Sequence, residues 1–342
     1  MNTTHSQAAV YVQTNESDAN SIVAFGRADD GTLNELGSYA TGGAGDGGAH
    51  LTSQGSVTIS QDGRQLLVTN AGSGDVSLFD ISTATPSLVQ TVMTGSAPKS
   101  VAEHAGRVYV LNTGEPSIAG FRLADGRLEP VTEGARSLAP NSDPAQIGFT
   151  PDGAALVVTE RGTNAIALFP LDDAGRLGEP QIHPSSGPTP YGFAFTRKGT
   201  LVVTEAFGAE TGRAAASSYS VRGESITPVS RSIGNGRSEI CWSVITADGR
   251  FAFTTNFADG AVSRWAIGND GTLTLEDATA GIAVDGETCL RDEDLSNDGR
   301  FLYAIDADSH RVFGWAVDAD GSLSPIGSWD GLPATVAGLV AS

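Results

Sequence analysis

Two glutamates that close short apolar runs carry the side chains of this chain best suited to acid–base chemistry. Glu160 ends the run 157–160 and Glu205 ends the run 202–205, where similar runs elsewhere end in Asn or Asp. If two carboxylates in neighbouring repeats approach each other, the pKa of one rises towards neutrality, which suits a general acid or base. Glu160 and Glu205 are therefore candidate catalytic residues. A structural role, in which each carboxylate binds backbone N–H groups of the next turn, is the alternative.

His50 is a third candidate for proton transfer. It ends the glycine-rich segment 41–50, which is long enough to fold over a neighbouring surface, and histidine titrates near neutral pH. The segment lacks the Gly-Lys-Ser/Thr ending of a phosphate-binding loop, so a flexible lid is the better interpretation. A solvent-exposed position without a chemical role is the alternative for His50.

Arginines provide the positive charge that an anionic substrate would need. The net charge is −20, from 20 basic and 40 acidic residues, so a carboxylated substrate requires local cations. The candidate substrate-binding residues lie in segments expected at one face of the molecule: Arg161, Arg237, Arg291, Gln54, Tyr191 and Trp242. For the arginines, pairing with nearby carboxylates is the alternative, above all for Arg291, which precedes the acidic run 292–294.

Two acidic groups offer oxygen ligands for a metal ion. They are the run 292–294 and the set Asp306, Asp308 and His310, and neither has the spacing of an EF-hand. We interpret both groups as solvated acidic faces and predict neither a metal ion nor another cofactor. A divalent cation such as calcium is the alternative.

Composition and termini restrict the partners and the compartment. No stretch of about 18 apolar residues is present, so no membrane span is predicted, and the acidic charge disfavours nucleic acids and anionic membranes. A small molecule is the predicted partner, and the oligomeric state is left open. The polar N-terminus lacks a secretory signal, which predicts a cytoplasmic protein, or a secreted or periplasmic one if a signal was removed. Cys241 and Cys289 begin comparable strands of successive repeats, so a disulfide and two free thiols are both compatible with the sequence.

The elements that position these residues follow from a repeat. Seven apolar runs end in a polar residue at intervals of roughly 40 to 50 residues, a spacing typical of propeller blades. The closing residues are Asn15, Asn70, Asn112, Glu160, Glu205, Asn256 and Asp306. Turns of the form Ser/Thr-x-Asp-Gly, such as residues 150–153, precede several of the runs and indicate hairpins. We predict an all-β fold, a seven-bladed β-propeller with four antiparallel strands per blade.

The two ends of the chain predict how the ring closes. The first repeat starts near Ala8 without a first strand, and residues 335–342 have the pattern of that missing strand. Pairing of the C-terminal strand with the N-terminal blade would close the ring and leave no long sheet edge exposed. We therefore predict a single domain over 1–342, with 1–7 as a disordered or extended tail. In such a ring the second-to-third-strand turns and the blade-to-blade loops share one face, where binding sites usually form.

Particular repeats resemble a known family. Residues 60–79 and 296–303, together with segments such as Tyr191-Gly192-Phe193 and Cys241-Trp242, resemble the seven-bladed lactonase family. That family includes 6-phosphogluconolactonase and the carboxymuconate cyclases, and the resemblance covers almost the whole chain. It is strongest to a 3-carboxymuconate cyclase-like branch. Characterised members usually carry a Pro-Arg-His step, whereas residues 143–146 here read Asp-Pro-Ala-Gln.

Two functions are compatible with these features. The resemblance implies an enzyme that opens or forms an intramolecular ester in a small carboxylated or polyhydroxylated compound, in a pocket at the loop-rich face. In the alternative, the propeller is non-catalytic and binds a small ligand or a protein through exposed aromatic residues on the same face. Tyr191, Phe207 and Trp242 would make those contacts.

Overall fold

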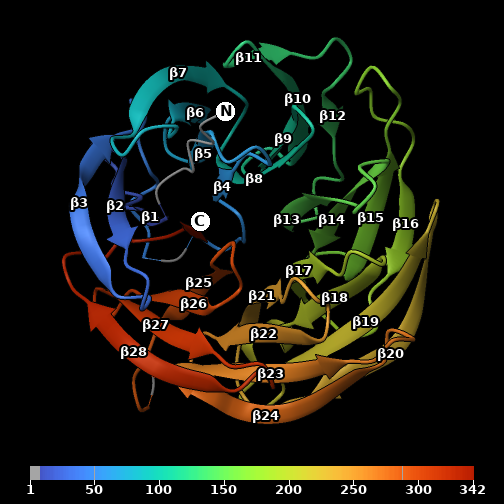
Figure 1. Ribbon diagram of the computed structural model, residues 1–342. Coiled ribbons are helices and arrows are strands. Elements are labelled where there is room, and N and C mark those ends of the chain that lie inside the picture. The colour runs from blue at the N-terminus through green and yellow to red at the C-terminus, as the bar shows by residue number, and fades with distance from the viewer. Residues whose placement is uncertain (1–7, 50, 287) are drawn as a thin grey trace, which may run out of the picture.

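The computed structural model describes residues 8–49, 51–286 and 288–342. Their strands form seven sheets around a central axis, and the C end lies near that axis (Figure 1). The seven-bladed propeller predicted from the repeat is confirmed. The sheets are called blades 1 to 7 in chain order, and the first strand given for each blade below is the one next to the axis.

Each blade is an antiparallel sheet that meanders outward. Blade 1 consists of β29 (Leu339–Ala341), β1 (Ala9–Gln13), β2 (Ser21–Arg27) and β3 (Leu33–Ala40). Blade 2 consists of β4 (Val57–Ile59), β5 (Gln65–Asn70), β6 (Asp75–Asp80) and β7 (Ser87–Met93). Blade 3 consists of β8 (Pro98–His104), β9 (Arg107–Asn112), β10 (Ser117–Ala124), β11 (Arg127–Pro130) and β12 (Arg136–Ser137). Blade 4 consists of β13 (Pro144–Phe149), β14 (Ala155–Glu160), β15 (Ala165–Pro170) and β16 (Gln181–Pro184). In blade 3 the outer position is shared, because β11 and the short β12 both pair with β10.

The remaining blades follow the same plan. Blade 5 consists of β17 (Pro190–Phe195), β18 (Thr200–Glu205), β19 (Ala215–Arg222) and β20 (Ser225–Gly234), with the 3-10 helix η1 (Phe207–Ala209) between β18 and β19. Blade 6 consists of β21 (Ile240–Ile245), β22 (Phe251–Asn256), β23 (Ala261–Ile267) and β24 (Leu273–Ile282). Blade 7 consists of β25 (Leu290–Leu295), β26 (Phe301–Asp306), β27 (Arg311–Val317) and β28 (Leu323–Trp329).

The turn between the first and second strands has the same chemistry in four of the blades. In blade 4, Thr150 Oγ1 donates to Asp152 Oδ1 at 2.7 Å, and the backbone N of Ala154 donates to the same oxygen at 3.1 Å. Gly153 then adopts a φ of +67°, a conformation that glycine reaches without strain. The same hydroxyl-to-Asp bond is repeated in blades 2, 6 and 7. We call the face that carries these turns the lower face, and the opposite face, with the blade-to-blade loops, the upper face.

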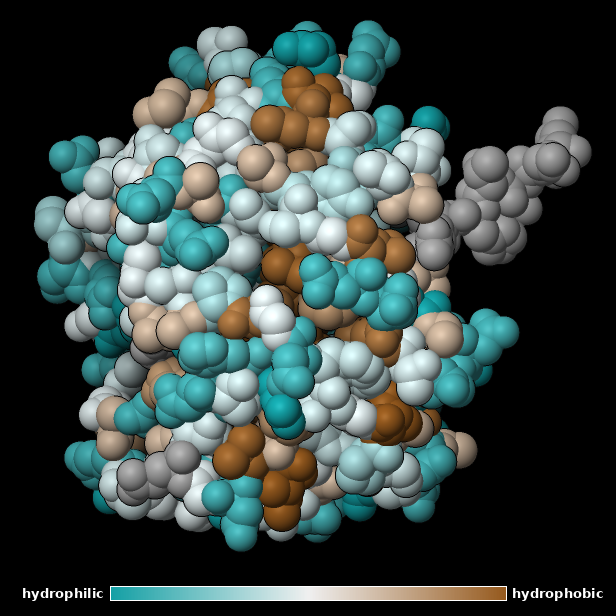
Figure 2. Space-filling model, turned by 90° about the vertical axis from the view of Figure 1, so that its left-hand side faces the viewer, coloured by the Kyte–Doolittle hydropathy of each residue, from teal (hydrophilic) through white to brown (hydrophobic). Residues whose placement is uncertain are grey.

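The hydrophobic core lies between successive blades. Between blades 4 and 5, for example, Val157 and Leu168 pack with Phe193, Val203 and Tyr219. Similar clusters follow around the ring, so each blade is stabilised by burial against both neighbours. On the outer wall, Figure 2 shows apolar residues only as small groups among hydrophilic ones. The wall in that view therefore carries no large apolar patch, and the search for a site turns to the axis.

The ring closes as the sequence predicts. Strand β29 pairs antiparallel with β1, with Val10 opposite Ala341 and Val12 opposite Leu339. The backbone N of Ser342 also donates to the carbonyl of Ala9 at 2.8 Å. Leu339 and Ala341 are buried in a cluster with Val10 and Val12, so closure removes apolar surface as well as a sheet edge. Within the described ranges, no helix is long and apolar enough to cross a membrane.

Removing the closing strand should destabilise the whole ring. We expect deletion of residues 339–342 to lower the free energy of unfolding by about 3 kcal/mol or more, because it strips buried side chains from β1 and β25. Urea denaturation measures this change. The matched control is Leu36→Ala in β3, where the side chain is 38% exposed and the expected loss is within about 0.5 kcal/mol. A truncated protein as stable as the full chain would contradict the closure account.

Candidate functional site

The two candidate catalytic glutamates lie at the ends of their second strands and are bound by their own blades. Glu205 is fully buried, and its Oε1 accepts hydrogen bonds from Ser217 Oγ at 2.5 Å and from the backbone N of Gly187 at 2.8 Å. Burial raises the pKa of Glu205 above its ordinary value. Glu160 Oε2 accepts a hydrogen bond from Thr163 Oγ1 at 2.5 Å. These contacts join a strand end to the adjoining loops, which is compatible with the structural alternative for both residues.

The inner strands carry a bulge near the upper face. The pairing register shifts between Pro190 and Phe193 in β17, between Ile240 and Trp242 in β21, and between Arg291 and Glu293 in β25. A bulge inserts an extra residue and re-aims the side chains beside it. As a result Tyr191, Trp242 and Arg291 from three successive blades lie near the same end of the channel.

These side chains form a continuous series of cation–aromatic and aromatic contacts. The guanidinium of Arg161 lies 5.2 Å from the ring centroid of Tyr191, whose centroid is 5.7 Å from that of Trp242. The centroid of Trp242 is 6.4 Å from that of Phe257, and the guanidinium of Arg291 lies 5.8 Å from the Phe257 centroid. We call Arg161, Tyr191, Trp242, Phe257 and Arg291 the upper cluster. It spans blades 4 to 7, and four of its five members were predicted from the sequence as substrate-binding residues.

Hydrogen bonds close the channel beside the upper cluster. Gln54, at the start of blade 2, donates through Nε2 to the carbonyl of Ser243 in blade 6 at 2.8 Å, and the backbone N of Ser243 donates to Gln54 Oε1 at 3.1 Å. Trp242 Nε1 donates to the carbonyl of Ser53 at 3.1 Å. Blades 2 and 6 are not neighbours, so these bonds cross the axis. Gln54 therefore lies at the end of the channel and holds it shut.

Arg291 is buried with its charge uncompensated by hydrogen bonds. Its side chain is 0% exposed, and none of its three guanidinium nitrogens has a hydrogen-bond partner in the described residues. Burial lowers the pKa of Arg291, and the charge of Asp292 partly opposes that shift. The expected alternative, in which Arg291 pairs with its acidic neighbours, is not found among the ion pairs of the described chain.

The acidic run after Arg291 is not the solvated face that its composition suggested. Asp292 and Glu293 are each only 4% exposed, because the strand that carries them forms the wall of the channel. Asp292 Oδ2 accepts a hydrogen bond from the backbone N of Gly338 at 2.9 Å, and Asp294 Oδ2 accepts one from Ala341 at 3.0 Å. Burial raises the pKa of Asp292 to about 6 and that of Asp294 to about 7. It also raises the pKa of Glu293 well above the ordinary value.

A pocket of about 640 Å³ occupies the channel below the upper cluster. It begins at Gln54 and Asp292, is lined by the inner strands, and extends to Gln61 and Pro151 in turns of the lower face. Its size lies within the range of roughly 300–1,000 Å³ typical of small-molecule sites. The described pocket therefore runs along the axis rather than across the loop-rich face.

The other predicted site residues are placed as follows. Arg237 lies in the loop between β20 and β21, where its backbone N donates to Asn235 Oδ1 at 2.9 Å, and it makes none of the upper-cluster contacts given above. Arg161 forms an ion pair with Asp143 at 2.7 Å. His50 lies outside the described residues, as does the expected tail 1–7. The expectation that Tyr191 and Trp242 are exposed is wrong, because they are 3% and 1% exposed.

Neither cysteine chemistry nor a metal cluster is found in this part of the chain. Cys241 and Cys289 are free thiols; burial raises the pKa of both, that of Cys289 to about 11, so both stay protonated at neutral pH. In the described ranges no group of three or more His, Cys, Asp or Glu is arranged to hold a metal ion.

Sequence reasoning missed Asp292 and Phe257 as members of the site. Phe257 follows Asn256 directly at a strand end, and Asp292 follows Arg291, so position in the repeat offered a signal for both. Their burial could not be predicted from the sequence, because a run of three acidic residues is usually solvated.

The fold and this channel site define a seven-bladed propeller of lactonase type. The chain belongs to the family described as "Lactonase, 7-bladed beta-propeller", whose model matches residues 56–206 and 203–336. No curated protein sequence matches the chain.

Solved structures of other propellers have the same fold. A candidate 6-phosphogluconolactonase from Bacteroides fragilis is 18% identical, with a TM-score of 0.74 over 100% of this chain and 99% of that chain. The periplasmic gluconolactonase of Pseudomonas aeruginosa is 20% identical, with a TM-score of 0.63 over 78% and 82%. A protein of unknown function from Desulfotomaculum acetoxidans is 14% identical, with a TM-score of 0.76 over 98% and 99%. At these identities the similarity establishes the fold.

The buried carboxyls predict an unusual pH dependence of stability. Asp292 and Asp294 have folded pKa values of about 6 and about 7, against about 3.9 in the unfolded chain. At pH values between the unfolded pKa and the folded pKa, the folded protein keeps protons that the unfolded chain has lost. The stabilisation that these bound protons give the folded state is complete below about pH 4 and is lost as the pH rises through 6 to 7. We expect the free energy of unfolding to fall by roughly 2 kcal/mol or more between pH 4.5 and 7.5.

Two variants test the origin of that slope. Asp294→Asn should flatten it in urea denaturations at a series of pH values. The matched control is Asp298→Asn. Burial raises the pKa of Asp298, but the hydrogen bonds from Ser296 and Arg300 outweigh this effect of burial and bring the pKa to about 2. That variant should leave the slope above pH 4.5 unchanged. Equal slopes in wild type and Asp294→Asn would contradict the assignment.

Proposed function

We propose that this protein is a lactone hydrolase for small lactones that carry an anionic group, acting at the upper end of the channel pocket, where Asp292 lines the pocket and the preceding residue, Arg291, lies buried beside it. The observation that carries the proposal is the fully buried guanidinium of Arg291, which has no hydrogen-bond partner in the described residues. Leaving a buried charge without a partner costs about 3–5 kcal/mol. A carboxylate or phosphate group of a ligand would supply the missing partner through two parallel N–H···O bonds.

Asp292 supplies the second function that hydrolysis requires. With a pKa of about 6, it is ionised at neutral pH and still basic enough to accept a proton from water. The oxygen of that water attacks the acyl carbon, the ring C–O bond breaks, and the leaving alkoxide oxygen takes up the proton. The product is a hydroxy acid. Membership in the lactonase family supports this reaction class.

The surroundings of Asp292 fit an uncharged ligand body. Val57, Val101 and Val244 line the same pocket and offer apolar surface, while Gln54 and Glu293 can hydrogen-bond hydroxyl groups of the ligand. Formation of an intramolecular ester from a hydroxy acid, with release of water, is the reverse of the same steps and would use the same residues.

A different catalytic set remains a second proposal within the same reaction class. In it Glu160 or Glu205, with His50, moves the proton, and Arg161, Arg237 and Arg291 hold the substrate. The raised pKa of Glu205 supports it. The position of Glu205 opposes it, because Glu205 is fully buried and does not line the channel pocket.

Non-catalytic binding of a small ligand is the alternative to hydrolysis. The burial of Tyr191 and Trp242 favours a small ligand over a protein partner, because a protein needs an exposed surface. A ligand that is bound but not hydrolysed would pair with the same guanidinium of Arg291.

Hydrolysis of a lactone panel, followed by the release of acid, tests the proposal. We expect Asp292→Asn to lower kcat about 100-fold, because it removes the proton acceptor. The wild-type kcat/KM should rise with pH through an apparent pKa near 6, the pKa of Asp292, and this rise should be absent in the variant. Arg291→Lys should raise KM about tenfold for anionic lactones and leave neutral lactones unaffected, because lysine lacks the planar fork.

Matched variants decide between the two catalytic sets. Glu160→Gln and Glu205→Gln should retain kcat within about threefold if Asp292 is the base. Loss of activity in either of them, with full activity in Asp292→Asn, would overturn the Asp292 proposal in favour of the glutamates. Binding of an anionic lactone without turnover of any panel member would favour the non-catalytic alternative.

A further inference from the structure

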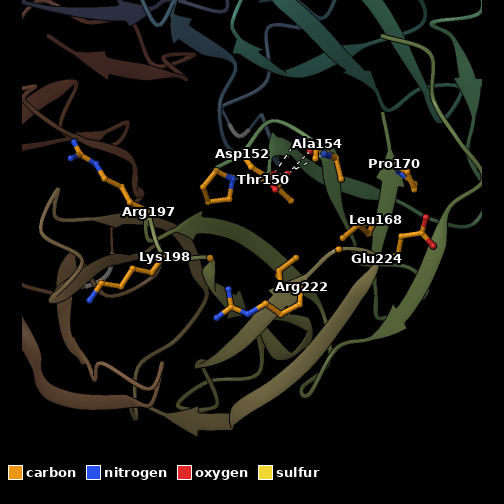
Figure 3. A pocket seen from close by; sticks show the side chains of 14 residues that line it. Thr150, Asp152, Ala154, Leu168, Pro170, Arg197, Lys198, Arg222 and Glu224 are labelled. Atoms are coloured by element: carbon orange, nitrogen blue, oxygen red, sulfur yellow. Dashed lines mark hydrogen bonds between the residues drawn. The ribbon is translucent and has the colours of Figure 1, made fainter. Parts of the chain in front are cut away.

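A second pocket lies on the lower face, in a groove between blades 4 and 5. Its volume is about 400 Å³, and its floor is formed by Ala155, Leu168 and Val221. Three cationic side chains line it, Arg197 and Lys198 from the turn between β17 and β18, and Arg222 from the end of β19. Figure 3 shows Arg197, Lys198 and Arg222 at one end of the groove, with the side chains of Arg197 and Lys198 extending away from it, and Glu224 at the other end.

The two cationic segments are held next to each other by backbone contacts. The backbone N of Val221 donates to the carbonyl of Gly199 at 3.2 Å. Gly199 has a φ of +89°, and a Cβ atom at that position would lie 4.0 Å from Arg222 Nη1. The backbone segments that carry Lys198 and Arg222 are therefore adjacent.

The turn that carries Arg197 and Lys198 departs from the rule that blades 2, 4, 6 and 7 follow, as does the turn of blade 3, which reads Glu103-His104-Ala105-Gly106. Four equivalent turns place Asp at the third position of Ser/Thr-x-Asp-Gly, and there the Asp accepts the hydroxyl hydrogen bond: Asp62, Asp152, Asp248 and Asp298. Blade 5 reads Thr196-Arg197-Lys198-Gly199. A lysine cannot accept the bond from Thr196, so this turn gives up a local stabilising contact and gains a cation. Such departures from a consistent local pattern are expected at functional sites.

The charges of the groove are also not neutralised as they are in neighbouring turns. Arg250 and Arg300, in the turns of blades 6 and 7, pair with Asp248 at 2.7 Å and with Asp298 at 3.0 Å. Among the ion pairs of the described residues, none involves Arg197, Lys198 or Arg222. Three cations without an ion-pair partner among the described residues thus line one cavity together with two carboxylates, Asp152 and Glu224, in a chain with a net charge of −20. Lys198 Nζ donates one long hydrogen bond, of 3.5 Å, to Asn269 Oδ1.

We propose that this groove binds the phosphate group of a small phosphate monoester, with Arg197, Lys198 and Arg222 as its ligands and the apolar floor beneath the organic part. A phosphate monoester carries close to two negative charges at neutral pH, which matches a cluster of three cations better than a single carboxylate does. Guanidinium groups bind phosphate through paired N–H···O bonds, and lysine adds a point charge. Glu224 at the far end excludes a longer polyanion by repulsion.

The groove is separate from the site at Arg291 but adjoins the same channel. Thr150 and Pro151 line both pockets, so a ligand in the groove would lie beside the lower end of the channel pocket. Asp292 lines the upper end of that pocket, next to the buried Arg291. Binding in the groove can therefore be measured without reference to lactone hydrolysis, and the two proposals can fail independently.

Calorimetric titration of the full-length protein at low ionic strength tests the proposal. The probes are inorganic phosphate, a hexose 6-phosphate, the unphosphorylated hexose and acetate. We expect both phosphate compounds to bind with a Kd below about 1 mM, and to bind more weakly as salt is added. The hexose should not bind, and acetate should bind at least about tenfold more weakly than phosphate because it carries a single charge.

Three variants locate the binding. Lys198→Asp restores the sequence rule of the other four turns, so it should fold with an unchanged or higher Tm, and it should weaken phosphate binding at least about tenfold. Arg222→Gln should weaken binding several-fold. The control Arg300→Gln removes a lower-face arginine that is already paired with Asp298, and it should bind phosphate within about twofold of wild type.

Four results would overturn the proposal. They are a lack of phosphate binding to the wild type, unchanged binding in Lys198→Asp or Arg222→Gln, equal weakening in Arg300→Gln, and acetate binding as tight as that of phosphate. In each case lactone hydrolysis by the same preparations shows separately whether the function assigned to Asp292 and Arg291 holds.

Discussion

The closing strand β29 is bound on both of its sides, and the ring and the site both depend on these contacts. On one side it pairs with β1. On the other, the carboxyl groups of Asp292 and Asp294 accept hydrogen bonds from the backbone N of Gly338 and of Ala341. Backbone N–H groups near the axis that would otherwise lack partners are thereby satisfied. The same contacts hold two acidic side chains inside the channel wall, where burial raises the pKa values of both.

The upper end of the channel combines charge and burial in a way that a purely structural site would not need. The aromatic rings of Tyr191, Trp242 and Phe257 lie between two arginines, and the inner arginine, Arg291, keeps its N–H groups without partners in the described chain. Replacing such a charge by an apolar residue of similar volume is often neutral or stabilising. The retention of Arg291 is therefore best explained by an anion that the folded chain itself does not supply.

The fold could be predicted from the sequence because the repeat is regular. The strand-end residues, from Asn15 to Asp306, fixed the number of blades, and the Ser/Thr-x-Asp-Gly turns fixed the hairpins. Closure by β29 followed because the first repeat lacked a strand. These features are local and periodic, so they can be read in sequence without knowledge of packing.

The site could be predicted only in part. Gln54, Arg161, Tyr191, Trp242 and Arg291 were placed at the same face because loop connectivity in a propeller is fixed, and the structure brings them to one end of the channel. Their burial could not be foreseen, because it results from bulges that shift the register of the inner strands. The acidic run was misjudged for the same reason. The lysine in the turn of blade 5 was visible in the sequence, but its meaning required the cavity beside it.

A crystal structure of the protein soaked with a small hydroxy acid, the product class of lactone hydrolysis, is the most direct test of the central claim. The account predicts a carboxylate with its oxygens about 3 Å from the guanidinium nitrogens of Arg291, at the end of the channel next to Asp292. A guanidinium that stays without a ligand at saturating acid, or that is already paired with a carboxylate of the chain itself, would contradict it.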